Sequence, residues 1–561
     1  MLPQLWFLLV SAVPGRSAPA PITAQTTLGA VLGVEEVVGG SSVATFRGVP
    51  FAATTGGANR FMPPQPRAPW SGVLNATLDG PGCRQPHHNA DVPCEGKEGP
   101  RCQSEDCLSV NVYCPSGADA HKPPAGYPVM FWIYGGAFDE GTNHGALGLY
   151  EGKRMAAAGR VCVVAPQYRL GVLGFLVTPA NPGNQGLQDQ RAAMRWAQAN
   201  VAAFGGDPGA VTIWGESAGA MSVAAHLASE RSAGLFRAAI MQSNVAAFQY
   251  QNHLVQRSTY GKDFVNRTGC GSLANLTCLQ AIDAKAITTL GEDVTHSVKD
   301  GVIARLLEGG RVEDALAMQW APVIDGVELK GQPLDILAAG GGNQVPVLLG
   351  SNQDEGATFV FAGVSTKLPM VLYKPLMTAI FGKNASAAVV DFYDAASAAW
   401  TDARDALSYV LTDFWFKCSA HRIAKAVAAG GRPAWVYRYN HKDSFKKLWP
   451  IYGLPTQCED RVCHGAEIPF VFDNYAGFSA TADELAMSAD MLEYWSSFAK
   501  TGDPNAGGKA ALAWPAFNGT DRLNIRLSIP TAVESSKDLP SGVLPTPGVC
   551  DFFDDVVGYH H

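Results

Sequence analysis

A chain of 561 residues of which 47% are hydrophobic can bury a large core, and this length is compatible with one large α/β domain. The formal net charge of −8, without a basic stripe, argues against a nucleic-acid-binding protein. After the N-terminal segment no apolar run is long enough to cross a bilayer, so we expect no transmembrane segment.

The N-terminus has the pattern of a secretory signal peptide, although the usual positive charge is missing. An apolar segment from Leu2 to Val13 is followed by small residues, and we expect cleavage between Ser17 and Ala24. We therefore predict an approximate signal peptide at 1–20, a single domain at 21–561 and a secreted protein. An N-terminal anchor is the alternative, which the short apolar length disfavours. Predicted glycosylation sites are the sequons at Asn75, Asn266, Asn275, Asn384 and Asn518.

Strand-like and helix-like segments alternate along the chain. Strands are predicted within 28–51 and 70–79 and at 108–113, 127–134, 161–167, 211–214, 236–242, 345–350 and 434–439. Helices are predicted at 185–201, 221–227 and 483–501, and 254–318 and 370–429 are mainly helical. This alternation predicts an α/β fold with a large, mostly parallel central sheet, flanking helices and helical insertions. A ligand site is then expected at the carboxyl ends of the strands.

The polar segment 82–106 is predicted to be a surface loop held by cross-links, because it is rich in Pro, Gly and His. It contains or adjoins the cysteines Cys83, Cys94, Cys102 and Cys107. The neighbouring His87 and His88 would suit a metal, but the segment has no C-x-x-C pair, so disulfides are favoured. We predict no metal site and no cofactor.

One stretch carries the pattern of a nucleophile elbow. Gly215-Glu216-Ser217-Ala218-Gly219 fits G-x-S-x-G and lies between a predicted strand and a predicted helix. Such a turn presents the Ser217 hydroxyl at the sheet edge, near a helix N-terminus that favours negative charge. The alternative is a plain glycine-rich turn.

Further along, the chain supplies the partners that a nucleophilic serine requires. Glycines at the end of the predicted strand 127–134 can direct backbone N–H groups to one point, as an oxyanion hole needs, although a simple glycine loop is the alternative. A carboxylate at Asp354 or Glu355 and then His464 follow Ser217 in the order Ser, Asp/Glu, His.

Several motifs together resemble type B carboxylesterases of the cholinesterase/lipase family, which have the α/β-hydrolase fold. The similarity runs almost from end to end, and its motifs are Phe46-Arg-Gly-Val-Pro-Phe-Ala52, Arg60-Phe61-x-Pro-Pro64, Glu105-Asp-Cys-Leu108, Tyr134-Gly-Gly-Ala-Phe138, Gln185-Gly-Leu-Gln-Asp-Gln190, Phe204-Gly-Gly-Asp-Pro208, Gly215 to Gly219, Asp354-Glu-Gly356 and His464-Gly465-x-Glu467. The resemblance implies a serine carboxylic-ester hydrolase.

The resemblance also implies the roles of individual residues. Ser217 corresponds to the nucleophile, His464 to the general base and then acid, and Glu355, rather than Asp354, to the orienting carboxylate. The oxyanion donors would be the N–H groups of Gly136, Ala137 and Ala218. Ala137 stands where many relatives have a third glycine, a difference that keeps the N–H.

Disulfides and ion pairs follow from the resemblance as well. The family's bridges correspond to Cys83–Cys107, Cys270–Cys278 and Cys418–Cys550, and its internal ion pairs to Arg60–Glu105 and Arg169–Asp189. Beyond the family pattern, we infer a bridge Cys458–Cys463 before His464. By elimination Cys94 would pair with Cys102, leaving Cys114 and Cys162 as buried thiols, although sequence alone does not determine connectivity.

The predicted substrate is a small-molecule or lipid ester without charge, hydrolysed by a broad carboxylesterase or lipase. Cholinesterases hold a quaternary ammonium with aromatic faces, but the segment between Cys83 and Cys107 has no aromatic residue except histidines, and Thr358 takes the other aromatic position. The alternatives are a cholinesterase-type enzyme and a non-catalytic, cholinesterase-like adhesion or binding protein. The complete set of Ser217, Glu355 and His464 argues against the latter, because such proteins typically lack the nucleophile. We make no prediction of oligomeric state.

Overall fold

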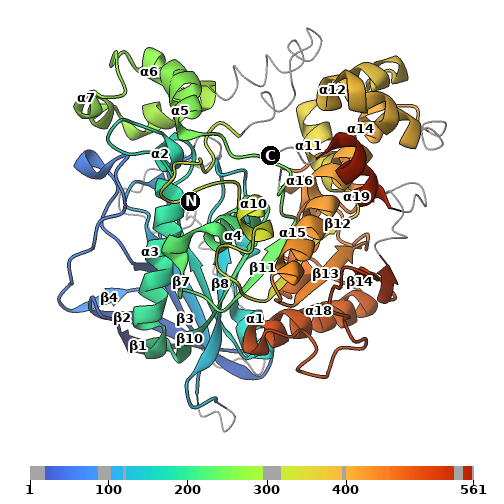
Figure 1. The fold of residues 1–561 in the computed structure, drawn as a ribbon. Helices are drawn as coiled ribbons and strands as arrows, with labels where there is room; N and C mark the ends of the chain where they lie inside the picture. Colours follow the sequence, from blue (N-terminus) through green and yellow to red (C-terminus); the bar gives the residue numbers. More distant parts are fainter. Residues whose placement is uncertain are drawn as a thin grey trace, which may run out of the picture.

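A large mixed sheet forms the centre of the molecule (Figure 1). The computed structural model describes residues 19–85, 103–117, 122–294, 318–393, 400–451, 453–535 and 548–558. Within them the sheet has 13 strands in the order β1-β2-β3-β7-β9-β8-β10-β11-β12-β13-β14-β15, with β4 beside β2. These strands are β1 (Ala20–Gln25), β2 (Ala30–Val38), β3 (Ser41–Pro50), β4 (Val73–Asn75), β7 (Ser109–Pro115), β8 (Tyr127–Ile133), β9 (Cys162–Pro166), β10 (Gly206–Glu216), β11 (Ala238–Gln242), β12 (Val347–Asn352), β13 (Ala434–Tyr439), β14 (Leu523–Leu527) and β15 (Ala532–Ser535).

The centre of this sheet is parallel and its two edges are antiparallel. Every neighbouring pair from β9 through β14 is parallel. The pairs from β1 through β3 and β7 to β9 are antiparallel, as are β14 and β15, and the short β4 pairs parallel with β2. All residues of β11, β12 and β13 are buried, because helices cover both faces of a parallel sheet. The predicted α/β-hydrolase architecture with a mostly parallel central sheet is confirmed.

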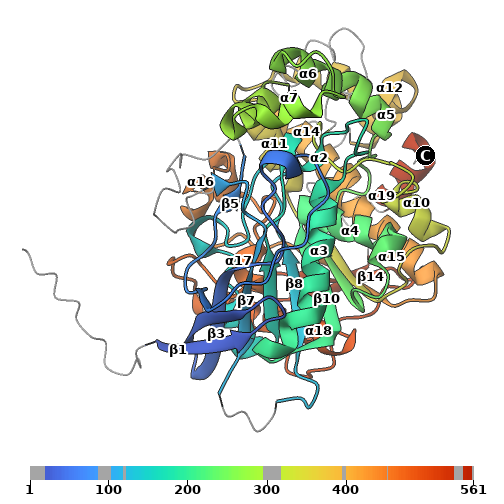
Figure 2. The same cartoon turned by 90° about the vertical axis from the view of Figure 1, so that its left-hand side faces the viewer.

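Helices lie on both sides of the sheet and extend beyond the carboxyl ends of its strands (Figures 1 and 2). The α-helices are α1 (Lys153–Gly159), α2 (Gly171–Phe175), α3 (Gln185–Asn200), α4 (Ala218–Ala228), α5 (His253–Gln256), α6 (Lys262–Thr268), α7 (Leu276–Ala281), α10 (Pro333–Ala338), α11 (Glu355–Gly363), α12 (Tyr373–Phe392), α14 (Ala403–Leu411), α15 (Cys418–Ala429), α16 (Leu448–Ile451), α17 (Ile468–Val471), α18 (Ala482–Thr501) and α19 (Val549–Phe552). Short 3-10 or π turns connect several of them, including η7 (Thr412–Lys417) and η8 (Thr456–Asp460).

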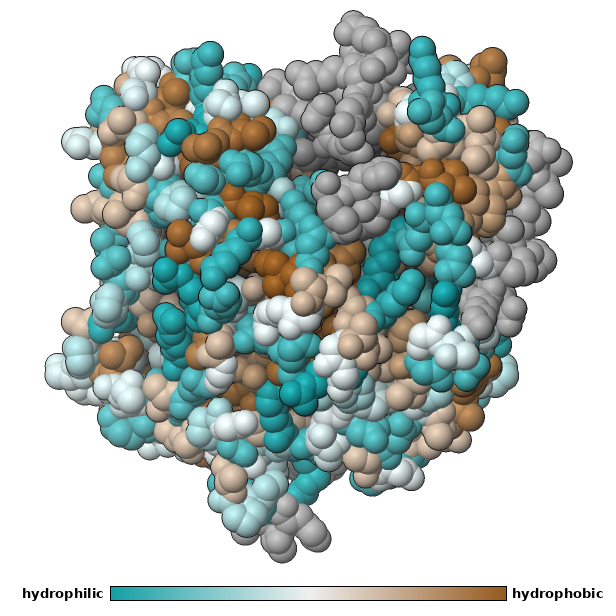
Figure 3. Space-filling view, viewed as in Figure 1, coloured by the Kyte–Doolittle hydropathy of each residue, from teal (hydrophilic) through white to brown (hydrophobic). Residues whose placement is uncertain are grey.

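The helical insertions carry a core of their own. Buried side chains of α12, α14 and α19 pack together in a second apolar cluster, separate from the large core around the sheet. The disulfide Cys418–Cys550 ties this cluster to the start of α15. On the face seen in Figure 3, the hydrophobic side chains lie scattered among hydrophilic ones, as expected when most apolar residues are in the core.

Some strands were not predicted. The edge strands β1 and β15, and β14 beside β15, are absent from the predicted set. A two-stranded sheet of β5 (Gly82–Cys83) and β6 (Gln103–Ser104) lies at the ends of the predicted cross-linked loop. Edge strands are half exposed and carry polar residues, so their sequences lack the continuous apolar runs of the central strands.

The disulfides agree with four inferred pairs and correct one assignment. The bridges Cys83–Cys107, Cys270–Cys278, Cys418–Cys550 and Cys458–Cys463 are present. Cys114 and Cys162 form a fifth bridge, so the prediction that both are thiols is wrong. The antiparallel register of β7 and β9 places these cysteines opposite each other, with Cα atoms 4.2 Å apart. Cys94, Cys102, His87 and His88 lie outside the described residues.

Two predicted ion pairs hold separate segments of the chain together. Arg60 binds Glu105 at 2.6 Å, and Arg169 binds Asp189 at 2.7 Å with both side chains buried. The Arg169–Asp189 pair joins the segment after β9 to α3. Among the described residues no helix is long and apolar enough to cross a membrane, and no group of three His, Cys, Asp or Glu side chains is placed to hold a metal ion.

Candidate active site

The turn between β10 and α4 has the strained geometry of a nucleophile elbow. Ser217 has φ 56° and ψ −124°, a conformation that L-residues rarely adopt, and α4 begins at the next residue. A Cβ atom at Gly219 would lie 1.9 Å from the carbonyl oxygen of Ile133, and one at Gly215 would lie 2.5 Å from Gly219. Both glycines are therefore required, because the helix passes directly over the ends of β8 and β10.

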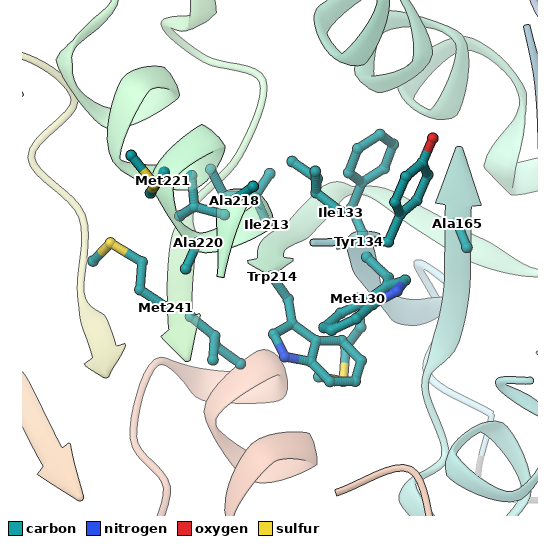
Figure 4. Close-up of a cluster of buried hydrophobic side chains, with 14 of the residues drawn as sticks. Met130, Ile133, Tyr134, Ala165, Ile213, Trp214, Ala218, Ala220, Met221 and Met241 are labelled. Carbon is teal, nitrogen blue, oxygen red and sulfur yellow. The ribbon is translucent and has the colours of Figure 1, made fainter. Parts of the chain in front are cut away.

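A packed core supports this turn from below. Figure 4 shows Ile213 and Trp214 of β10, Met130 and Ile133 of β8, and Ala218, Ala220 and Met221 of α4 in one cluster of buried hydrophobic side chains around the turn. The Trp214 ring packs against Trp132 and Phe472, with centroids 4.5 and 4.6 Å away. A close-packed interior of this kind resists displacement, so the strained serine keeps its position.

The loop after β8 lies against Ser217. A Cβ atom added to Gly135 would be 2.9 Å from the Ser217 Cβ, and one added to Gly136 would be 2.2 Å from the Glu140 carbonyl oxygen. Gly136 has φ 108° and Ala137 has φ 54°, so two successive residues adopt positive φ. Within the described part of the chain nothing accepts a hydrogen bond from the N–H groups of Gly136, Ala137 and Ala218. These donors are free to bind a ligand oxygen, as an oxyanion hole requires.

Glu355 and His464, which are 109 residues apart, meet beside this turn. Glu355 Oε2 lies 2.5 Å from His464 Nδ1. The Glu355 side chain is fully buried at the first residue of α11, where the helix dipole favours a carboxylate. Its other oxygen accepts hydrogen bonds from the Asn352 N–H at 2.7 Å and the Ser243 hydroxyl at 2.6 Å. Glu355 is thus held in one orientation, with the oxygen nearest to the imidazole aimed at Nδ1.

Asp354, the other candidate carboxylate, has a different contact. Its Oδ2 accepts a hydrogen bond from the Val462 N–H at 2.9 Å, and its own N–H donates to the Val462 carbonyl. Burial raises the pKa of the Asp354 carboxyl. The structure therefore brings Glu355 to the imidazole, and Asp354 holds the loop that carries it.

The second nitrogen of His464 faces the residue before Ser217. Glu216 Oε1 lies 3.1 Å from His464 Nε2, but neither atom completes a hydrogen bond within the described residues, so Nε2 forms none with the Ser217 hydroxyl either. The contact with Glu216 is electrostatic when the imidazole is protonated, and in the neutral imidazole Nε2 has no partner among the described residues and can accept a proton. Hydrogen bonds between catalytic groups are often long in ligand-free enzymes and shorten when substrate binds.

Three buried glutamates surround the imidazole and determine its charge. Burial lowers the pKa of His464, but the carboxylates of Glu216, Glu355 and Glu467 outweigh this and raise it to about 9. Burial raises the pKa of Glu216 to about 8, which the imidazole partly opposes. Glu467 accepts hydrogen bonds from Asn352 at 2.6 Å and Gln242 at 2.8 Å. From the sequence, Glu216 was named only as part of the G-x-S-x-G stretch, because its contact with Nε2 depends on the tertiary fold.

Two aromatic rings lie against the imidazole. The ring centroids of Phe359 and Phe416 are 5.0 and 5.2 Å from that of His464, and the two phenyl rings stack at 5.6 Å. Phe359 is 39% exposed, whereas Phe416 is buried. Neither residue was predicted from the sequence. Phe359 could have been found, because it lies four residues after Glu355 and so on the same helix face, but no local pattern places Phe416 here.

The site combines an elbow serine, a buried Glu–His pair and free N–H donors at the carboxyl ends of a parallel sheet. This combination is that of an α/β-hydrolase. The model of the Carboxylesterase family matches residues 20–539. This protein belongs to the carboxylesterase family and is a carboxylic ester hydrolase.

Relatives of known name cover most of the chain. A cholinesterase of Mus musculus is 32% identical over 551 residues, covering 93% of this chain and 86% of the relative. The Crystal protein of Dictyostelium discoideum is 32% identical over 517 residues, covering 91% and 87%. Among solved structures, a PNB esterase is 31% identical with a TM-score of 0.72, and a thermophilic PNB esterase is 30% identical with a TM-score of 0.73. Each comparison covers 92% of this chain and 97% of the other.

Proposed function

We propose that this protein is a secreted serine esterase that hydrolyses uncharged carboxylic esters through an acyl-enzyme, with Ser217, His464 and Glu355 as its catalytic triad. The observation that carries the proposal is the 2.5 Å contact between Glu355 Oε2 and His464 Nδ1, beside an elbow that presents Ser217. This contact directs the basic nitrogen of the imidazole away from Glu355, as a general base requires. Residues 21–561 would form one catalytic domain after the signal peptide.

The chemistry follows from these positions. Ser217 Oγ attacks the ester carbonyl while His464 Nε2 removes its proton, and the N–H groups of Gly136, Ala137 and Ala218 stabilise the oxyanion. The imidazolium then protonates the departing alcohol, leaving an acyl group on Ser217. Water repeats the attack, gives its proton to Nε2, and the acid leaves as Ser217 regains a proton. Glu355 stabilises the imidazolium in both halves of the cycle.

The surroundings of the imidazole support an uncharged substrate. Phe359 and Phe416 offer apolar surface beside His464, and Phe359 is accessible to a ligand. Thr358 points its hydroxyl to the backbone of His464 and supplies no aromatic face for a cation. The cholinesterase relative makes choline esters the second candidate substrates. A non-catalytic role, the third candidate, is opposed by the intact elbow.

Secretion is supported by the surface and the cross-links. The asparagines of all five sequons are exposed, at Asn75, Asn266, Asn275, Asn384 and Asn518. Disulfides such as those described here persist in oxidising compartments. Strand β1 begins at Ala20, so cleavage between Ser17 and Ala20 would leave it intact.

The test is the variant Ser217→Ala, assayed with p-nitrophenyl butyrate and labelled with a fluorophosphonate. We expect kcat/KM to fall by at least about 10⁴ and labelling to disappear, because the nucleophile is lost. Ser258→Ala, which removes an exposed hydroxyl bonded to the Val255 carbonyl, is the matched control and should behave like the parent. Activity of Ser217→Ala within about tenfold of the parent would contradict the proposal.

The substrate class is tested with two butyrate esters that differ only in charge. Butyrylcholine and its carbon isostere 3,3-dimethylbutyl butyrate have the same shape. If no ring faces the head group of the substrate, the enzyme should favour the uncharged ester, since a cation–π contact contributes only when a ring faces the cation. A preference for butyrylcholine would instead support the cholinesterase alternative.

A further inference from the structure

The loop that ends at His464 is closed by a disulfide. Cys458, in η8, and Cys463 form a bridge across a separation of 5 residues, and both are buried. His464 follows Cys463 directly, so the position of its backbone depends on how this small ring is held against the rest of the molecule.

One hydroxyl group joins both ends of this ring. Thr358 Oγ1 accepts a hydrogen bond from the His464 N–H at 3.2 Å and lies 3.8 Å from Cys458 Sγ. A disulfide sulfur carries no proton, so the Thr358 hydroxyl is the donor toward Cys458 and the acceptor toward His464. The Thr358 side chain is buried.

Thr358 belongs to a face of α11 that contacts this loop along its length. Asp354 exchanges two hydrogen bonds with Val462, and the Phe361 ring lies 4.9 Å from the guanidinium carbon of Arg461. Residues 354, 358 and 361 recur at helical spacing, so they share one side of α11. Glu355 lies on the same helix and binds the imidazole. Helix α11 therefore provides the Glu355 carboxylate and also holds the backbone of His464.

We infer that Thr358 is a positioning residue for His464. Its hydroxyl couples the Cys458–Cys463 ring to α11 and keeps the imidazole within hydrogen-bond distance of Glu355. The inference rests on the proposed function, because it assumes that His464 is the base. From the sequence, position 358 stood out only as the place of a missing aromatic group. In this chain the side chain holds the base instead of facing a substrate cation.

The direct test compares Thr358→Val, which keeps the shape and removes the hydroxyl, with Thr358→Ser, which keeps the hydroxyl. We expect Thr358→Val to lower kcat about tenfold with KM within about twofold, since a displaced base acts on the chemical step rather than on binding. Thr358→Ser should restore most of the parental kcat. Thr378→Val is the matched control, because it removes a helical hydroxyl that bonds to the Lys374 carbonyl and Ser386 in α12.

The pH profile separates positioning from a general loss of folded enzyme. Loosening His464 from Glu355 removes an interaction that raises the pKa of the imidazole, so the acid limb of kcat/KM should move to lower pH by about half a unit. Rates are normalised to active sites titrated with a fluorophosphonate. Thr358→Val with parental kcat per titrated site, or with an unmoved acid limb, would overturn the inference.

The disulfide provides an independent arm. The double variant Cys458→Ala/Cys463→Ala should lower kcat in the same way. Adding Thr358→Val to it should lower kcat by less than the product of the two separate fold-changes, because both changes release the same backbone. If the two fold-changes in kcat simply multiply, Thr358 and the disulfide act independently and the inference is overturned. Failure of the proposed function would give a different result, because Ser217→Ala would then remain active.

Discussion

Replacing Glu216 by Gln should move the acid limb of the pH–rate profile to lower pH. The active enzyme needs a neutral His464, so activity is lost as the pH falls through the pKa of the imidazole. Glu216 is the first of three carboxylates that raise this pKa to about 9, against the lowering effect of burial. The structure thus places the acid limb above the pH of about 6–7 expected for an ordinary histidine base. Glutamine keeps the shape of the side chain and removes its charge.

The magnitude follows from the contact distance. Glu216 Oε1 lies 3.1 Å from His464 Nε2, and at an effective dielectric constant of about 20 a unit charge pair at this separation interacts by about 5 kcal/mol, equivalent to about 4 pH units. This is an upper bound, because the pKa of Glu216 is itself raised to about 8 and the two groups exchange protons in the same pH range. We therefore expect a downward shift of about 1 to 2 pH units in the variant.

The assay measures kcat/KM for p-nitrophenyl butyrate across the pH range at constant ionic strength, with active sites titrated. Glu230→Gln is the matched control, because it removes the same charge from an exposed side chain that pairs with Lys330. The control should leave the acid limb in place. If Glu216→Gln also leaves it in place, or moves it to higher pH, the electrostatic reasoning about His464 is refuted.

Two further predictions concern the oxyanion loop and the new disulfide. Gly136→Ala should lower kcat about 100-fold, because its Cβ would meet the Glu140 carbonyl at 2.2 Å and displace an N–H donor. Ala137→Gly should change kcat little, because it retains the N–H at a residue with φ 54°. Equal effects of the two substitutions on kcat would contradict this prediction. The double variant Cys114→Ala/Cys162→Ala opens a bridge that spans 48 residues. Its free energy of unfolding, measured by urea denaturation, should be lower than that of the parent by up to about 4 kcal/mol. A variant as stable as the parent would argue against this bridge.

Much of the fold was predictable because its central strands are buried on both faces. Segments such as 345–350 and 434–439 are short apolar runs bounded by turn residues, and they form β12 and β13. The elbow was predictable as well, because strand, glycine-flanked serine and helix are adjacent in the sequence. β14 and the edge strand β15 were missed, since their short sequences mix polar and apolar residues and lack such runs.

What the sequence alone determined is local: the central strands, the strained turn at Ser217 and the order of the motif residues. Only the tertiary structure decided which side chains meet. The register of β7 against β9 pairs Cys114 with Cys162, and the packing of η7 brings Phe416 to His464. The physical reason is that backbone conformation depends on neighbouring residues, whereas a contact between distant residues depends on strand order, register and helix packing.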